Sequence, residues 1–129
     1  MREILFKAKR VDNGEWVNGF YLRREDEHII EEKSPHPEYR VVFTEHSVLQ
    51  ETVCQFTGLL DKNGVKIFEG DILIDKRIYE VIWTIERARF SLLDRRANGA
   101  TTSLAGYSMV DCEIIGNRFD NPELIGGAE

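Results

Sequence analysis

The chain alternates apolar and polar residues over short stretches that are separated by turn signals. Residues 4–9, Ile-Leu-Phe-Lys-Ala-Lys, repeat with a period of two and predict a first strand. The Asn-Gly step within 12–14 supplies the positive backbone torsions of a two-residue hairpin turn, so residues 16–22 are expected to return as the second strand. Gly19 interrupts that strand and predicts a bulge or a close approach of another backbone segment.

The same kind of pattern continues to the end of the chain. Further short strands are expected over residues 28–30, 39–44, 53–57, 72–74, 79–85, 88–92, 101–104 and 113–116. Within 79–85, one face of the strand is expected to carry Tyr79, Val81, Trp83 and Ile85, and the other face Glu80 and Thr84. No stretch carries the pattern of a long amphipathic helix, so the predicted fold class is mainly β, with short antiparallel strands.

The turn signals favour two small lobes within one compact body. Residues 1–55 are expected to form an N-terminal β-hairpin lobe with a variable loop over 24–50, in which the Pro-punctuated segment 32–38 is a loop. Residues 56–129 are expected to form a lobe that resembles a small SH3-like barrel, packed with the first lobe and closed by a C-terminal latch. A chain of 129 residues is long enough for one such domain.

Composition and charge narrow the function classes. Hydrophobic residues make up 42% of the chain and charged residues 31%, which is enough apolar material for a core without a disulfide or a metal. The net charge is -6, from 8 basic and 11 acidic residues up to Gln55 and 9 basic and 12 acidic residues after it. Neither part therefore carries the net positive charge that is typical of a nucleic-acid binder.

The two cysteines, Cys54 and Cys112, are too far apart for a CxxC redox or zinc motif. Both are flanked by strand-like sequence and are expected in the core as free thiols. The apolar run after Met1 is broken within three residues, so no export signal is expected, and no stretch is long enough to cross a bilayer. These features predict a cytoplasmic protein, because thiols stay reduced there.

Candidate catalytic and metal-binding groups are scattered, and the three histidines do not cluster in the sequence. Glu69 and Asp71 flank Gly70 and could bind a divalent cation, but a structural turn in which Asp71 accepts backbone N–H groups is the preferred interpretation. The turn Asp61-Lys62-Asn63-Gly64 is shorter than a calcium loop and lacks its terminal glutamate. It is also interpreted as structural, so no cofactor and no metal are expected.

Two further groups of residues are candidates for binding a partner. The first is a set of arginines, Arg87, Arg89, Arg95 and Arg96, interpreted as a solvated rim because acidic residues interleave with them, with a local nucleic-acid contact as the alternative. The second is Leu124 and Ile125, which could dock back as a C-terminal latch or anchor a partner-binding tail. The large aromatic residues Trp16, Phe20, Phe68, Tyr79, Trp83 and Phe90 are assigned to the core, with a base-stacking platform as the alternative.

Three separate segments carry motifs in a recognisable order: 4–17, Gln55–Ile72 and Ile115–Leu124. Together they resemble the YopX family of small phage and prophage proteins. The motif residues, interpreted as structural, are Asn13, Gly14, Trp16, Gly58, Asp61, Asn63, Gly64, Glu69, Gly70, Asp71, Gly116, Asn117, Asp120, Asn121 and Pro122. The chain departs from the family pattern at Cys54 and Phe56, where family members commonly have glycine and tyrosine.

The resemblance implies a phage-encoded or prophage-encoded protein of the bacterial cytoplasm, and it brings no catalytic residues, since the family's biochemical role is not established. We therefore expect a non-enzymatic protein that binds or modulates a host or phage protein through strand edges and loops of its second lobe. Open strand edges also favour a homo-oligomer. A small nucleic-acid-binding barrel is the alternative, a metal-dependent hydrolase is less favoured, and no membrane partner is expected.

Overall fold

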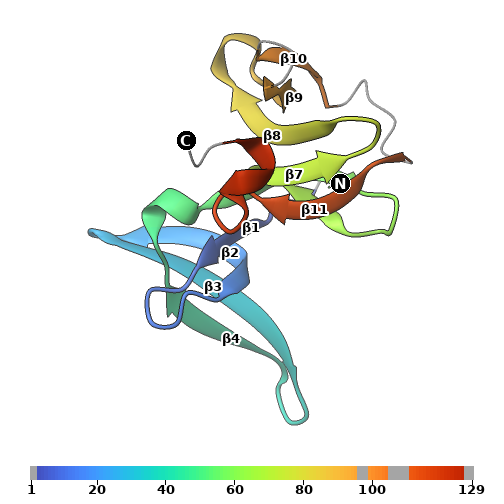
Figure 1. Cartoon of the computed structure of the whole chain (residues 1–129). Coiled ribbons are helices and arrows are strands. Elements are labelled where there is room, and N and C mark those ends of the chain that lie inside the picture. The colour runs from blue at the N-terminus through green and yellow to red at the C-terminus, as the bar shows by residue number, and fades with distance from the viewer. Residues whose placement is uncertain (1–2, 96–98, 105–110, 127–129) are drawn as a thin grey trace. The chain divides into compact units, whose positions relative to one another are not determined.

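A computed structural model describes residues 3–95, 99–104 and 111–126 of the chain (Figure 1). The strands are β1 (Phe6–Lys9), β2 (Trp16–Arg24), β3 (Glu27–His36), β4 (Arg40–Ser47), β5 (Cys54–Leu60), β6 (Lys66–Phe68), β7 (Asp71–Ile74), β8 (Ile78–Thr84), β9 (Arg89–Asp94), β10 (Ala100–Ser103) and β11 (Glu113–Asn117). Short 3-10 turns occur at η1 (Gln50–Thr52), η2 (Ile85–Arg87) and η5 (Pro122–Ile125). These residues contain no α-helix, so the mainly β class is confirmed.

The strands form two antiparallel sheets. The six-stranded sheet has the order β4-β3-β2-β1-β5-β6, and the five-stranded sheet has the order β10-β9-β8-β7-β11. The described residues do not close either sheet into a barrel, because each order has two end strands. For the second lobe, the structure therefore shows an open antiparallel sheet.

The chain divides into two compact units, residues 1–56 and 57–129, each with its own core. The core of the first unit is built by Ala8, Val17, Ile30 and Val48, with Phe6, Tyr21 and Val53 packed against it. The core of the second unit is built by Ile67, Leu73, Val81, Leu92, Leu104 and Cys112, with Leu59, Tyr79, Phe90 and Ile114 packed against it. Cys54 and Cys112 are both buried and free, as predicted.

The first hairpin is confirmed, but its turn is longer than the sequence predicted. Arg10 N–H donates to the Glu15 carbonyl at 2.9 Å, which closes a loop over residues 11–14 in place of a two-residue turn. Gly14 within it has a φ of 72°, a torsion that glycine adopts readily. Gly19 lies where another strand approaches closely, since a Cβ atom there would be 2.1 Å from the Glu31 carbonyl oxygen.

The prediction of a loop over residues 32–38 is wrong for most of that segment, because β3 continues to His36. Val48 N–H donates to the His28 carbonyl at 2.9 Å, so the even-numbered residues of β3 direct their backbone groups toward β4. Pro35 is odd-numbered, and its nitrogen faces the other side, where β3 has no paired strand at that point. A proline is compatible with a strand in that position.

Two of the aromatic residues assigned to the core are exposed instead. Trp83 is 46% exposed and Phe20 is 51% exposed, whereas Phe68 is buried. Trp83 lies at the end of β8 next to η2, and Phe20 lies on a face of β2 that no core residue covers. Strand periodicity assigns a residue to a face but does not say whether another layer covers that face.

Candidate functional site

The fold separates Arg95 from two other candidate arginines, Arg87 and Arg89. Arg95 donates to the Glu80 carboxylate from Nε at 3.2 Å and from Nη2 at 3.0 Å, so it belongs to an ion pair inside the second unit. Arg87 is exposed in η2, and Arg89 donates from Nε to the Ser91 hydroxyl at 3.2 Å. Arg96 lies outside the described residues. Among the arginines of this set that the structure describes, Arg87 and Arg89 are the two that lie at the turn between β8 and β9.

Glu80 is a buried charge that strand periodicity did not identify. Its side chain is 4% exposed, and Arg118 Nη1 lies 3.7 Å from its second carboxylate oxygen. A buried carboxylate is costly unless it is paired, and here two guanidinium groups supply the pairing. Arg95 and Arg118 come from distant parts of the sequence, so no local motif could have revealed this site. The cluster ties β8 to the end of β9 and to the turn after β11.

The two aspartates of the candidate cation sites are held by the backbone. Asp61 accepts N–H groups from Asn63 at 2.8 Å, Val65 at 2.9 Å and Ile114 at 3.1 Å. Burial raises the pKa of Asp61, but these backbone hydrogen bonds together outweigh burial and hold it below its ordinary value. Asp71 accepts the Phe68 N–H at 2.8 Å. Both carboxylates thus accept backbone N–H groups at turns.

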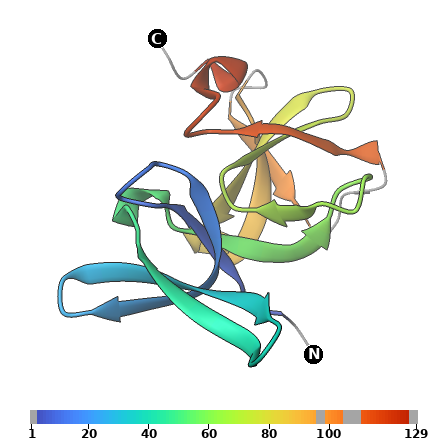
Figure 2. The same ribbon diagram turned by 90° about the horizontal axis from the view of Figure 1, so that it is seen from below.

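The motif residues after β11 build one tight turn from their own side chains. The Asn117 amide oxygen accepts N–H groups from Phe119 and Asp120, each at 3.0 Å. The Asn121 amide oxygen accepts the Asn117 N–H at 3.2 Å, and a Cβ atom on Gly116 would lie 2.4 Å from that oxygen. The turn leads into η5, which follows β11 in Figure 2. This segment of the family motif is therefore a structural device.

The other candidate residues, Leu124 and Ile125, lie beside Arg95. All three line a cavity of about 260 Å³ together with Ile78, Leu93, Glu123 and Gly126. The two apolar side chains are half-buried, and η5 contacts β8. This placement matches a segment that folds back onto its own sheet, with Gly126 ending the turn at a φ of 69°.

The turn between β8 and β9 presents the most exposed large apolar side chain among the described residues of the second unit. Ile85 is 80% exposed, and the ring of the neighbouring Trp83 packs edge-on against Phe90 with centroids 5.0 Å apart. Arg87 is exposed within the same turn. We call Trp83, Ile85, Arg87 and Phe90 the β8–β9 apex. The sequence showed these residue types, but only the exposure of Trp83, Ile85 and Arg87, with the half-buried Phe90 ring against Trp83, marks them as a surface.

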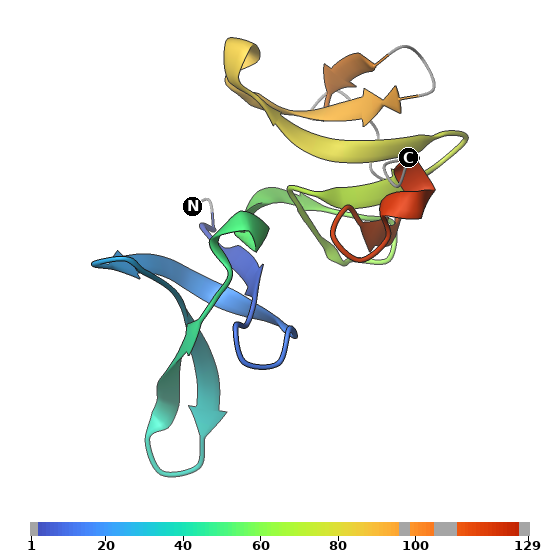
Figure 3. The ribbon, with the colours of Figure 1, turned by 60° about the vertical axis from the view of Figure 1, so that its left-hand side comes forward.

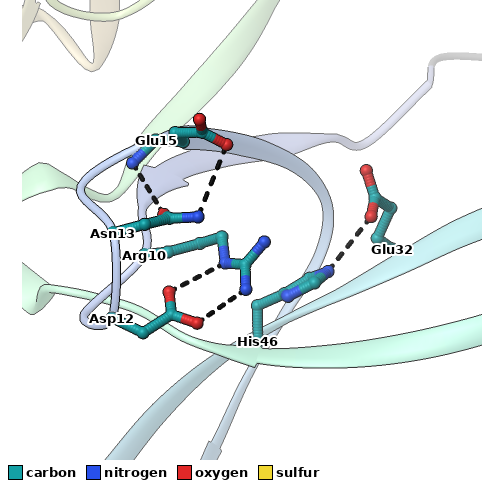
Figure 4. A network of polar contacts seen from close by, with 6 residues as sticks. All are labelled: Arg10, Asp12, Asn13, Glu15, Glu32 and His46. Atoms are coloured by element: carbon teal, nitrogen blue, oxygen red, sulfur yellow. Dashed lines mark hydrogen bonds and ion pairs between the residues drawn. The ribbon is translucent and has the colours of Figure 1, made fainter.

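The first unit contains a polar network at its first hairpin (Figure 4). Arg10 donates to both oxygens of Asp12, at 3.0 and 2.7 Å, which lowers the pKa of Asp12 and raises that of Arg10. His46 Nε2 lies 3.0 Å from a Glu32 carboxylate oxygen on the neighbouring strand. Each acidic group drawn there is directed at a donor of the same unit, so the network fastens the hairpin.

No group of three or more His, Cys, Asp or Glu residues is placed to hold a metal ion within residues 3–95, 99–104 and 111–126. In the same part of the chain, no helix has the length and apolar character needed to cross a membrane.

Comparisons with known proteins agree with the motif order read from the sequence. No curated protein matches the chain. The family model of the YopX protein matches residues 5–126, which include both cores, the Asp61 turn and the Gly116–Asn121 turn. Since this match spans nearly the whole chain, the protein belongs to the YopX family.

Proposed function

We propose that this chain is a non-enzymatic binding protein whose β8–β9 apex engages a protein partner. The observation that carries the proposal is the exposure of Trp83 and Ile85, at 46% and 80%, beside an exposed arginine. Tryptophan and arginine dominate the energetically important positions of protein interfaces. An apolar tip of this kind fits a pocket in a partner, and Arg87 favours an acidic rim around that pocket.

Local hydrogen bonds hold the apex in one conformation. Ala88 N–H donates to the Ile85 carbonyl at 3.2 Å, and Ala88 adopts a left-handed backbone with a φ of 49°. Below the turn, the Thr84 hydroxyl donates to the Ser91 hydroxyl at 2.8 Å. A rigid anchor loses little conformational entropy on binding, which favours affinity.

The use of the buried carboxylates supports a non-enzymatic role. Asp61 is occupied by three backbone N–H groups, Glu80 by two arginines, and Asp94 by Arg77 at 2.6 Å. A general acid, a base or a metal ligand needs a carboxylate that can reach a substrate or an ion. These three groups instead stabilise turns and strand ends.

The proposal also includes the cellular location and the origin of the protein. We place the protein in a bacterial cytoplasm as a phage-encoded or prophage-encoded modulator, because it belongs to the YopX family. We also interpret the second unit as an open variant of a small SH3-like barrel, on the basis of its short, consecutive antiparallel strands β7, β8, β9 and β10.

Single-stranded nucleic acid is the alternative partner for the same apex. The Trp83 and Phe90 rings could stack on bases, and Arg87 and Arg89 could contact phosphates. The net charge of -6 opposes this alternative, and Arg95 is already paired with Glu80. Fluorescence anisotropy with oligonucleotides distinguishes the two alternatives. Binding of the oligonucleotide at low salt that weakens as salt rises would indicate phosphate contacts, whereas docking of a protein through an apolar tip does not require oligonucleotide binding.

The test uses a photo-crosslinking amino acid at Ile85 in the full-length chain, expressed in cells in which a prophage is induced. One protein, crosslinked with or without nuclease treatment and then shown to bind after purification, supports the proposal. Trp83→Ser should reduce that purified binding at least about tenfold, as expected for an interface anchor. Val65→Asp is the control, because Val65 is 51% exposed in the same unit but lies outside the apex. Equal binding by wild type and Trp83→Ser would exclude the apex.

A further inference from the structure

The edge of β4 is the longest strand edge left open in the first unit. β4 is an end strand of the six-stranded sheet, and β3 is its paired neighbour among the described residues. The β2 pairing of β3 stops at Glu31, so β3 and β4 continue from there as a two-stranded ribbon. Figures 1 and 3 show this hairpin extending past the ends of β1 and β2. A two-stranded ribbon is marginally stable in water without further contacts.

The register identifies which backbone groups of β4 face outward. His28 and Val48 form a hydrogen-bonded pair, with Val48 N–H donating at 2.9 Å. Antiparallel pairs alternate, so Val42 and Thr44 direct their N–H groups to β3, whereas Phe43 and Glu45 direct theirs to the open edge. Ser47 confirms the alternation, because its carbonyl accepts the Val11 N–H at 2.9 Å on that outer side.

Apolar side chains accompany these outward backbone groups. Phe43 is 49% exposed, and Val41 is exposed on the same face two residues earlier. On the opposite face, His46 Nε2 lies 3.0 Å from a Glu32 carboxylate oxygen. Arg40 is exposed at the start of β4, with a φ of 56°. The Glu32 side chain remains 42% exposed, so its carboxylate can accept a further donor.

We propose that a second copy of this chain docks on the β4 edge, with the two β4 strands antiparallel about a two-fold axis at Phe43. In this register Phe43 lies opposite Phe43 of the second copy, and Val41 lies opposite Glu45. The outward N–H and carbonyl groups of Phe43 then pair with each other across the axis. Each copy supplies the same surface, as a two-fold interface requires.

Charge complementarity favours a second copy over an unrelated strand. The same register puts Arg40 of each copy opposite His46 of the other, and His46 Nε2 lies 3.0 Å from Glu32. Arg40 can then reach the exposed Glu32 carboxylate of the other copy, twice by symmetry. Pairing also removes an open edge, which sheet proteins otherwise protect. The proposal is independent of the β8–β9 apex, which lies in the other unit.

Amide exchange on the wild-type chain tests the register directly. Raising the protein concentration should slow exchange of the Phe43 and Glu45 amides at least about tenfold, while Val42 and Thr44, already bonded to β3, serve as internal references. Sedimentation over the same concentrations should show a mass of about twice 15.0 kDa. A single 15.0 kDa species at every concentration, or Phe43 exchange that ignores concentration, would overturn the proposal.

A backbone variant distinguishes strand pairing at the β4 edge from nonspecific hydrophobic association. Phe43→Pro removes an outward N–H and keeps every bond from β4 to β3, as Pro35 shows to be tolerated in the neighbouring strand. It should abolish the dimer. Phe20→Ala removes a ring of nearly equal exposure, 51% against 49%, from a strand that is not at the edge, and should leave the dimer intact. Equal loss in both variants would contradict edge pairing.

A charge exchange tests the two-fold register. Arg40→Glu and Glu32→Arg should each weaken self-association when studied alone, because each creates like charges across the axis. A mixture of the two variants should associate again, since each heterodimer restores both opposite-charge contacts. Circular dichroism of each variant confirms that it remains folded. Failure of the folded variants to recover association in the mixture would exclude this register.

Discussion

The carboxylate of Asp61 accepts the N–H of Ile114 at 3.1 Å and so joins two residues that are 53 positions apart in the chain. The same carboxylate caps its own turn through Asn63 and Val65. One side chain therefore closes the Asn-Gly turn after β5 and attaches β11, an end strand, to it. Lys62 N–H reinforces this attachment by donating to the Cys112 carbonyl at 2.9 Å.

Replacing Asp61 by asparagine should destabilise the second unit by about 1–3 kcal/mol, because the amide has one acceptor oxygen where the carboxylate uses two. Chemical denaturation followed by tryptophan fluorescence measures the loss, since Trp83 reports on this unit. Asp26→Asn is the matched control, because Asp26 is fully exposed at a hairpin turn. A change of similar size in both variants would show that Asp61 has no special role.

Acid should lower the folding stability of the wild-type protein through protonation of Asp61. The pKa of Asp61 is lower in the folded protein than its ordinary value of 3.8, so the carboxylate binds protons more readily after unfolding. Its stabilising contribution is complete above about pH 5 and is lost as pH falls through the ordinary value toward the folded one. Denaturation series at several pH values should show a shallower acid dependence for Asp61→Asn than for wild type. Parallel curves would contradict this assignment.

Gly116→Ala should disrupt the turn after β11, since the added Cβ would lie 2.4 Å from the Asn121 amide oxygen. We expect a loss of about 1–3 kcal/mol, typical of overpacking. In an Asn121→Ala background the two closest atoms are removed and only the Cβ atom of residue 121, at 3.1 Å, remains close, so the cost of the same change should fall by about 1 kcal/mol or more. Gly14→Ala provides the comparison, because Gly14 has open space around it and its cost should not depend on residue 121.

The arginines of the second unit should divide into structural and exposed ones. Arg95→Met removes the nearer partner of the buried Glu80 and should cost about 1–3 kcal/mol, because Arg118 at 3.7 Å compensates only in part. Arg87→Met should change stability by less than about 0.5 kcal/mol, as is usual for an exposed residue. Thermal unfolding of both variants checks the difference. A larger loss for Arg87 would reverse the assignment.

Local patterns were sufficient for the strand class and for most strand positions. Alternation placed β1, β2, β8 and β9 within a few residues of their observed bounds, because a strand exposes alternate residues to different surroundings wherever it lies. The close approach of another strand to Gly19 was also predicted from the sequence, since glycine within a strand often marks a place where a side chain would not fit. Pro35 led to the wrong prediction of a loop over 32–38. A proline lacks an N–H group and so prevents a hydrogen bond on only one side of its strand, while the other side can still pair, as β3 does with β4.

The candidate surfaces depended on information that a linear pattern does not carry. The exposure of Trp83 and Phe43 depends on whether another layer covers their faces, and the partners of Glu80, Arg95 and Arg118, lie 15 and 38 positions further along the chain. Turn chemistry and periodicity act between neighbours in the chain, so the amino-acid order alone specifies most of the strands and the family, but not the length of the first turn or the extent of β3. Burial and ion pairing act between residues that meet only after folding. The three-dimensional arrangement therefore decides which arginine is structural and which strand edge stays open.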